Sequence, residues 1–201
     1  MTEIKKALET GYSYSEYREL VSKLLEQNES TTEGGSQVLV DYSKLNNSRM
    51  KRLDKTTKIP SEIENEIKKI DSKVMWVVIS EGWCGDAAQN IPAINKMAEL
   101  NENIELKIVL RDKNIELMNQ YLTNGNQAIP KLIQIKNNSV TATWGPRPSV
   151  ASKMVTDYKE KHGTLDAEFK KDLQVWYNNN KNESLFNDFL GLLSAKQTEA
   201  V

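Results

Sequence analysis

The chain has 201 residues, of which 38% are apolar and 27% charged, and its 27 Lys and Arg nearly balance its 28 Asp and Glu, giving a net charge of −1. A chain of this length and composition can bury one good core with helical additions around it. The near-neutral charge provides no field that would recruit nucleic acid or an anionic membrane, so we expect neither as a partner.

The first 70 residues are predicted to form a helical extension. The initial segment MTEIKKALETGYSY has no hydrophobic run suited to a secretory signal, and no later stretch approaches about 18 apolar residues, so we expect a cytoplasmic protein. Ser13 and Glu16 have the spacing of a capping box. The residues that follow predict a helix with one apolar stripe, made of Tyr17, Leu20, Val21, Leu24 and Leu25.

A loop and two more helices are predicted in the rest of this extension. Residues 29–37, ESTTEGGSQ, have the composition of a flexible loop with nothing to bury. A second helix is indicated by Leu45, Met50 and Leu53. Ser61 and Glu64 have the spacing of a capping box at the start of a third helix, whose apolar side would consist of Ile63, Ile67 and Ile70.

Residues 71–161 show a different pattern, in which strands alternate with helices. VMWVVI, residues 74–79, is an unbroken apolar run rich in β-branched residues, as expected of a central strand covered on both faces. The elements expected after it are a helix behind Cys84, a strand at 104–110, a helix around Leu117, a hairpin of strands at 131–135 and 140–144, and a helix around Val155. This order predicts an α/β sandwich with a mixed sheet.

Residues 162–201 are predicted to form a C-terminal extension of two helices. The apolar stripe of the first consists of Leu165, Phe169, Leu173 and Trp176, and that of the second consists of Leu185, Phe186, Phe189, Leu190 and Leu193. Together with the N-terminal helices, these helices would cap the sandwich and restrict access to Cys84, or they would pair with another subunit.

Cys84 is the only cysteine, and it lies in SEGWCGDAAQNIP, where a strand is predicted to give way to a helix. A single cysteine excludes an internal disulfide framework and any multi-cysteine zinc site, and we expect no metal and no cofactor. At the first turn of a helix, free backbone amides and the helix dipole stabilise a thiolate. The negative charge of Asp86 opposes this effect. We expect partial cancellation that leaves a thiol more acidic than free cysteine.

Four short motifs follow one another in this part of the chain. Trp83-Cys84-Gly85 lies at the junction of strand and helix, Pro92 lies inside the helix, Ile129-Pro130 precedes the predicted hairpin, and Gly145 follows it. In this order and spacing they resemble the thioredoxin family, which has Trp-Cys-Gly at this junction, a proline-kinked helix, a cis proline before its final hairpin and a glycine beyond it. More specifically, EGWCGDAAQ, LRDKN, IPKLI and WGPRP resemble a bacterial subgroup labelled only as thioredoxin family proteins.

The resemblance implies a thioredoxin-like three-layer sandwich with Cys84 as the catalytic nucleophile. It implies a cis Ile129–Pro130 bond, which would expose the Ile129 backbone beside the sulfur for pairing with an extended partner. Arg147 would reach an acidic group on a ligand or steady the thiolate, or would be solvated or paired structurally. The substrate-binding residues implied are Trp83, Gly85, Asp86, Ile129, Pro130, Gly145 and Arg147.

The sequence departs from the family pattern at two positions that serve dithiol chemistry. Ala87 stands where the family has its second active-site cysteine, and Val78 stands where the family buries an aspartate that accepts a proton. The nucleophile and the implied substrate surface remain, whereas the resolving thiol and its proton acceptor are both absent.

These features lead to a principal hypothesis and two alternatives. In the principal hypothesis the protein is a monothiol oxidoreductase, whose partners are a disulfide-containing protein or a low-molecular-weight thiol that resolves a mixed disulfide on Cys84. In the first alternative it is a redox-inactive adaptor that binds partners through the surface around Trp83, Ile129 and Pro130. In the second, Cys84 captures a thiol-reactive ligand or an oxidant and acts as a sensor through its sulfenic acid.

Overall fold

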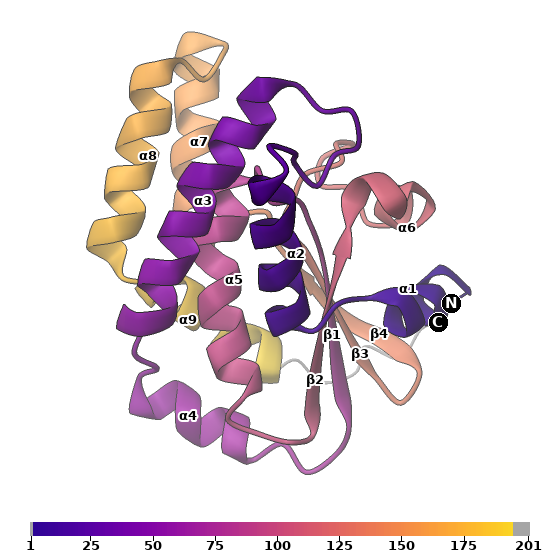
Figure 1. Cartoon of the computed structure of the whole chain (residues 1–201). Coiled ribbons are helices and arrows are strands. Elements are labelled where there is room, and N and C mark those ends of the chain that lie inside the picture. The colour runs from indigo at the N-terminus through magenta and orange to yellow at the C-terminus, as the bar shows by residue number, and fades with distance from the viewer. Residues whose placement is uncertain (1, 195–201) are drawn as a thin grey trace.

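Figure 1 shows the computed structural model of the chain, which describes residues 2–194. Residues 195–201, at the end of the predicted C-terminal extension, lie outside the described residues. The elements in chain order are α1 (Thr2–Thr10), α2 (Tyr14–Glu26), α3 (Gln37–Thr56), α4 (Ser61–Lys68), β1 (Val74–Ser80), α5 (Gly85–Ala98), β2 (Ile104–Leu110), the 3-10 helix η1 (Arg111–Lys113), α6 (Ile115–Gln120), β3 (Lys131–Lys136), β4 (Ser139–Trp144), α7 (Ser149–His162), α8 (Ala167–Asn180) and α9 (Glu183–Ser194).

The four strands form one mixed sheet in the order β2-β1-β3-β4. Strand β1 is parallel to β2 and antiparallel to β3, and β3 is antiparallel to β4. The prediction of an α/β fold with a mixed sheet is therefore confirmed. Strand β1 lies inside the sheet and is almost completely buried, as its unbroken apolar sequence predicts. Beyond the β2 edge, Tyr12 forms an isolated bridge with Ile108, which covers part of that edge.

Helices cover both faces of the sheet, so the molecule has three layers. Helices α2, α3 and α5 lie on one side, and α1 and α6 lie on the other (Figure 1). The N-terminal helices share the core of the sheet, because buried residues of α1 to α4 belong to the same apolar cluster as the strands: Ile4, Ala7, Tyr17, Val21, Met50, Ile63 and Ile67. Their burial keeps these helices in fixed positions over the strands.

Two helix starts show how local sequence fixes an element boundary. The capping box of α2 is present, since the Ser13 hydroxyl accepts from the Glu16 amide and the Glu16 carboxylate accepts from the Ser13 amide. The prediction that Ser61 and Glu64 form a capping box at the third helix is wrong. Helix α4 begins at Ser61 itself, its N-cap is Pro60, and no side chain caps it. Pro60 fixes an extended entry into the helix without donating or accepting through a side chain.

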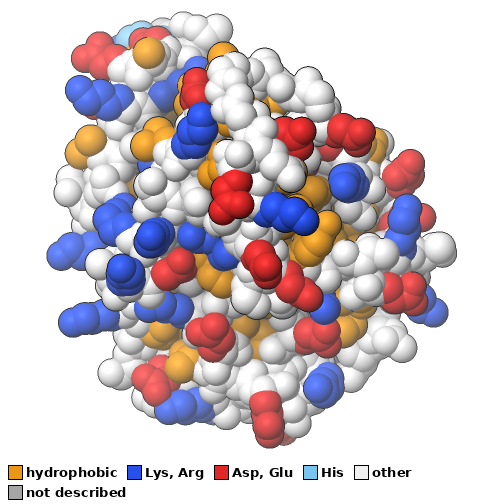
Figure 2. Space-filling view, in the orientation of Figure 1, with side chains coloured by type: hydrophobic (Ala, Val, Ile, Leu, Met, Phe, Trp, Pro, Cys, Tyr) orange, Lys and Arg blue, Asp and Glu red, His pale blue; other side chains and the backbone are white. Residues whose placement is uncertain are grey.

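The C-terminal helices approach the start of α5 from outside the sheet. Helices α7 and α8 share a small apolar cluster of their own, made of Ala151, Val155, Phe169, Leu173 and Tyr177. Helix α8 lies beside α3 (Figure 1), and the side-chain Nε2 of Gln89 in α5 donates to Oε1 of Gln174 in α8 at 3.0 Å. Many Lys and Arg side chains are visible on the side of the molecule formed by α3 and α8 (Figure 2). Helix α8 therefore places side chains close to the segment that contains Cys84.

Candidate functional site

Cys84 is the N-cap residue of α5, at the end of the short loop that follows β1. Its sulfur accepts a hydrogen bond from the Ala87 amide at 3.4 Å, and its thiol donates to the Ile129 carbonyl oxygen at 3.3 Å. The side chain is only 7% exposed. The sequence prediction that Cys84 stands at a helix start is confirmed, and the sulfur also contacts the loop before β3.

The Cys84 thiol is less acidic than the sequence predicts. Burial, and after it the charge of Asp86, raises the pKa of Cys84 to about 12. Hydrogen bonds from the Ala87 and Asp86 amides and the charge of Arg147 act in the opposite direction but do not compensate. The prediction of a thiol more acidic than free cysteine is therefore wrong for the folded protein. Removal of the sulfur from solvent raises its pKa more than the backbone amides at the start of α5 lower it.

Asp86 is buried beside Cys84 and has two partners from distant parts of the chain. Its carboxylate forms an ion pair with Arg147 at 2.7 Å and accepts from the Tyr177 hydroxyl at 2.9 Å. Burial raises the pKa of Asp86, while the Arg147 charge and the two hydrogen bonds lower it. Of the roles considered for Arg147, the structure shows the pairing with Asp86. This pair joins the start of α5 to the loop after β4, and Tyr177 adds α8 to the same cluster.

The Ile129-Pro130 segment lies directly against the start of α5 and the loop after β4. The Ile129–Pro130 peptide bond is cis, and so is the Gly145–Pro146 bond. Ile129 is 7% exposed, and Pro130 is also buried. The flat apolar landing surface expected from Trp83, Ile129, Pro130 and Gly145 is therefore reduced, since two of its four residues have little area to offer a partner.

Gly145 occupies a position that a side chain cannot enter. Its φ is +109°, and a Cβ atom built there would lie 2.1 Å from the Pro130 carbonyl oxygen. A backbone angle in this region is unfavourable for residues other than glycine, and a contact this short with backbone forces one segment to move. The closeness of the two loops around Cys84 thus depends on this glycine.

Replacing Gly145 with alanine is expected to destabilise the fold by roughly 2 kcal/mol or more, because the new methyl group collides with the Pro130 carbonyl. Gly163 is the matched control, since its φ is also positive, at +78°, but a Cβ there meets nothing within 4 Å. Gly163→Ala is expected to cost about 1–2 kcal/mol from backbone conformation alone. Urea unfolding of both variants measures the difference, and equal losses would contradict the predicted collision.

Trp83 is held beside the N-terminal loop rather than pointing freely outward. Its indole N–H donates to the Thr32 hydroxyl at 2.8 Å, and the Arg111 guanidinium lies over its ring at 5.0 Å. Arg111 also pairs with Asp112 at 2.8 Å, and Thr32 donates to Asp112 at 2.6 Å. The loop between α2 and α3 therefore fixes the orientation of the tryptophan next to Cys84.

The same loop buries residues that the sequence prediction treated as solvent-exposed. Ser30 and Thr31 are both buried. The Thr31 hydroxyl donates to the Glu81 carboxylate and accepts from the Gly82 amide, and the Ser30 hydroxyl donates to the Thr32 carbonyl oxygen. Glu81 is itself buried and accepts from the Asp112 amide at 3.0 Å. Burial raises the pKa of Glu81, and these hydrogen bonds lower it. The prediction of a loop with nothing to bury is wrong, because its hydroxyls satisfy a buried carboxylate.

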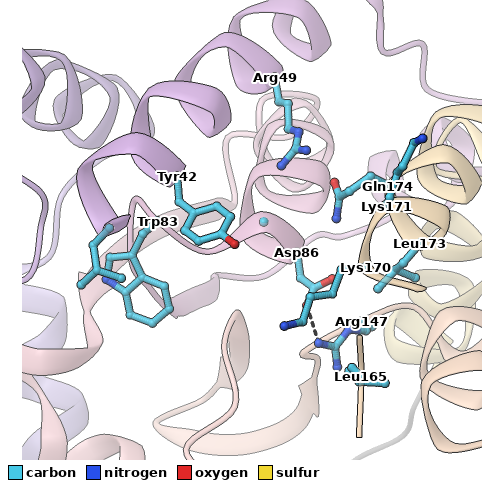
Figure 3. Close-up of a pocket in the computed structure, with 12 residues that line it drawn as sticks. Tyr42, Arg49, Trp83, Asp86, Arg147, Leu165, Lys170, Lys171, Leu173 and Gln174 are labelled. Atoms are coloured by element: carbon cyan, nitrogen blue, oxygen red, sulfur yellow. Dashed lines mark ion pairs between the residues drawn. The ribbon is translucent and has the colours of Figure 1, made fainter. Parts of the chain in front are cut away.

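A cavity of about 590 Å³ lies between α3, α8 and the start of α5 (Figure 3). Four of the predicted site residues line it, namely Trp83, Gly85, Asp86 and Arg147. The remaining wall comes from the helical extensions and consists of Leu39, Tyr42, Arg49, Leu165, Lys170, Lys171, Leu173 and Gln174. Cys84, Ile129, Pro130 and Gly145 are not among the lining residues. The predicted site residues thus fall into two adjoining groups, one around the sulfur and one on the wall of the cavity.

Sequence reasoning missed most of the residues that surround this segment. Tyr177 and Arg49 come from the two helical extensions, and nothing in their local sequence indicates contact with the start of α5. Glu81 was open to recognition, because an acidic residue directly after a buried strand requires a partner. Within residues 2–194, no helix is long and apolar enough to cross a membrane, and no group of His, Cys, Asp and Glu side chains is arranged to hold a metal ion.

Comparisons with known proteins agree with this architecture. A crystal structure of a protein of unknown function from Pseudomonas aeruginosa is similar, with a TM-score of 0.57 and 17% identity over 90% of this chain and 97% of that one. The crystal structure of an HIV epitope-scaffold is similar with a TM-score of 0.60 and 16% identity, over 96% of this chain and 98% of that one. At these identities the likeness concerns the fold alone. A comparison with curated proteins finds no match.

A family model described as Thioredoxin matches residues 35–159. The match begins before α3 and ends within α7, so it includes α3, α4 and the whole sheet. It therefore contains the Cys84 segment, the Ile129-Pro130 segment and Gly145. Because this match covers more than half of the chain, the protein belongs to the thioredoxin family.

Proposed function

We propose that the protein is a monothiol thiol-disulfide oxidoreductase in which Cys84 is the nucleophile. In the first step the Cys84 thiolate attacks one sulfur of a disulfide, a mixed disulfide forms on Cys84, and the other half leaves as a thiolate that takes up a proton. In the second step an external thiolate attacks the substrate sulfur of the mixed disulfide. A disulfide between substrate and external thiol forms, and Cys84 leaves as a thiolate. Electrons are supplied by the external thiol, and the protein ends unchanged.

One observation carries this proposal: the position of the Cys84 sulfur between a helix start and the backbone of Ile129. The sulfur lies 3.4 Å from the Ala87 amide and 3.3 Å from the Ile129 carbonyl oxygen. A thiolate formed at this place would keep the amide as a hydrogen-bond donor and would have the positive end of α5 behind it. The alanine in Cys-Gly-Asp-Ala, the motif of the bacterial subgroup that the sequence resembles, supports a mechanism in which the second thiol comes from outside.

The cytoplasm, where we place this reaction, supplies such external thiols. The buried sulfur, 7% exposed, favours a small disulfide over one in a folded protein, because a folded partner cannot bring its disulfide within bonding distance of a covered atom. The raised pKa of Cys84 makes the reaction slow at neutral pH, because only the thiolate attacks.

The pH dependence of alkylation tests the state of this thiol. With a Cys84 pKa of about 12, the rate at which iodoacetamide modifies the folded protein is expected to rise about tenfold for each pH unit between 7 and 10, without levelling off. The protein unfolded in urea serves as control and should level off around its ordinary value of about 8.5. A folded-state midpoint below that value would contradict the raised pKa and would mean that the resting thiol is not buried.

A redox-inactive binding protein is the second candidate, and one specific observation favours it. The same burial that raises the Cys84 pKa is also what an inert, well-packed cysteine would show. In that case Trp83 and the cavity beside it would serve partner recognition, and Cys84 would contribute only packing. If folded protein resists alkylation at every pH up to 10 and reacts only in urea, the second candidate replaces the first.

A further inference from the structure

The cavity between α3, α8 and the start of α5 has the size and walls of a small-molecule site. Its volume of about 590 Å³ falls within the range of about 300–1,000 Å³ typical of ligand pockets. One part of its wall is apolar and consists of Leu39, Tyr42, Trp83, Leu165 and Leu173. In Figure 3 Tyr42 and Trp83 lie on the α3 side, and Leu173 and the two lysines lie on the α8 side. This combination suits a molecule with a short apolar backbone and polar ends.

The charged part of the wall has an excess of positive charge. Arg49, Lys170 and Lys171 line the cavity, and among the residues that the structure describes none of the three forms a salt bridge with a carboxylate. Asp86 is the one acidic residue of the wall, and it is already paired with Arg147. The partly buried Arg49 and the exposed Lys170 and Lys171 therefore line the cavity without a counter-ion among the described residues, which favours an anionic ligand.

The surroundings of Arg49 show that no residue in the described range 2–194 pairs with its charge. Burial, with a further contribution from the charge of Arg52, lowers the pKa of Arg49. Its guanidinium donates to the neutral Asn46 side chain at 2.9 Å. An anion in the cavity would remove this penalty, because it would supply the charge that Arg49 lacks.

The cavity lies against the residues on both sides of the nucleophile. Trp83 precedes Cys84, Gly85 and Asp86 follow it, and all three line the wall. A Cβ atom at Gly85 would have Gln174 Nε2 at 3.6 Å and Arg49 Nη1 at 3.7 Å as its nearest neighbours. The donors of α3 and α8 therefore lie directly over the first residue of α5, one residue away from the sulfur.

We propose that this cavity binds the external thiol of the exchange reaction, and that this thiol is an anionic low-molecular-weight thiol. The proposal rests on the monothiol function and specifies the class of its co-substrate. The acidic group of the ligand contacts Arg49, Lys170 and Lys171, while its apolar part lies against Tyr42 and Leu173. In the second step the bound thiol loses its proton to solvent, its sulfur attacks the substrate sulfur of the mixed disulfide, and Cys84 leaves as a thiolate.

Binding is measured first without any exchange, with reduced glutathione as the anionic thiol probe and calorimetry on the Cys84→Ser protein. We expect the triple variant Arg49→Gln, Lys170→Gln, Lys171→Gln in that background to weaken binding at least about tenfold, because charge-assisted contacts are lost. Lys51→Gln is the matched control, since it removes an exposed charge from α3 outside the cavity and should leave the affinity unchanged. No binding, or equal binding by the triple variant, overturns the proposal.

Turnover then separates the failure of this proposal from the failure of the proposed function. With Cys84 intact, the rate of reduction of the neutral 2-hydroxyethyl disulfide is measured with reduced glutathione and with the neutral thiol 2-mercaptoethanol. We expect the triple variant to lower the ratio of the glutathione rate to the 2-mercaptoethanol rate at least about tenfold, because only the anionic thiol uses the cations. An unchanged ratio overturns the anionic site and leaves the monothiol function standing. Specific binding to the Cys84→Ser protein, together with no turnover by wild type, overturns the monothiol function and leaves the anion site standing.

Discussion

Cys84→Ser is expected to reduce thiol-disulfide exchange to the uncatalysed background while leaving the fold intact. A serine hydroxyl has nearly the same size, but it forms no disulfide and is not ionised at accessible pH. At the N-cap of α5 it can still accept from the Ala87 amide and donate to the Ile129 carbonyl. We therefore expect a melting temperature within about 4 °C of wild type, which corresponds to a change of up to 1 kcal/mol. Exchange of 2-hydroxyethyl disulfide with an added thiol measures the activity.

Retained exchange by a folded Cys84→Ser protein would rule out the monothiol mechanism, because the chain contains no second cysteine. Comparison of melting temperatures distinguishes this result from unfolding. A variant that loses both activity and structure would show that the Cys84 sulfur is needed for packing.

Asp86→Asn is expected to lower the pKa of Cys84 and to accelerate its alkylation. The substitution removes the negative charge that raises this pKa, and it frees Arg147, whose charge lowers it. For each pH unit by which the pKa falls, the thiolate fraction at pH 8 rises about tenfold, and the alkylation rate rises with it. We expect a stability loss of about 1–3 kcal/mol, because Arg147 and Tyr177 lose a charged partner.

Arg147→Gln is the matched control for Asp86→Asn, because it breaks the same ion pair from the other side. It leaves the Asp86 charge unopposed beside the sulfur, so the Cys84 pKa rises further and alkylation slows. The two variants should lose similar stability and change the alkylation rate in opposite directions. A change in the same direction would contradict electrostatic control and would point instead to loosening of the start of α5.

The elements that the sequence predicted well are those whose signal is local. The apolar run of residues 74–79 indicates the buried strand β1, because a short run rich in β-branched residues is typical of a strand covered on both faces. Ser13 and Glu16 specify the start of α2 in the same way. The Trp-Cys-Gly motif placed Cys84 at a strand-to-helix junction, since a motif and the elements on either side of it are close together in the chain.

The parts of the site that the sequence did not predict depend on contacts between distant segments. Tyr177 reaches Asp86 across 91 residues of sequence, and Thr31 reaches Glu81 across 50. The pKa of Cys84 also depends on contacts between distant segments, because several segments pack around the sulfur and remove it from solvent. The cavity lies between α3 and α8. The periodicity of apolar residues in each helix predicts which face is buried, but it does not predict which other helix packs against that face.

The central claim is that Cys84 forms a mixed disulfide in the folded protein, and intact-mass measurement tests it most directly. Folded wild-type protein is incubated at pH 9 with excess oxidised glutathione, which raises the thiolate fraction about a hundredfold over pH 7. We predict one glutathione adduct per chain, absent from Cys84→Ser and removed by an added low-molecular-weight thiol. No adduct on the folded protein, with one adduct appearing only in urea, would contradict the claim and show that Cys84 is a packing residue.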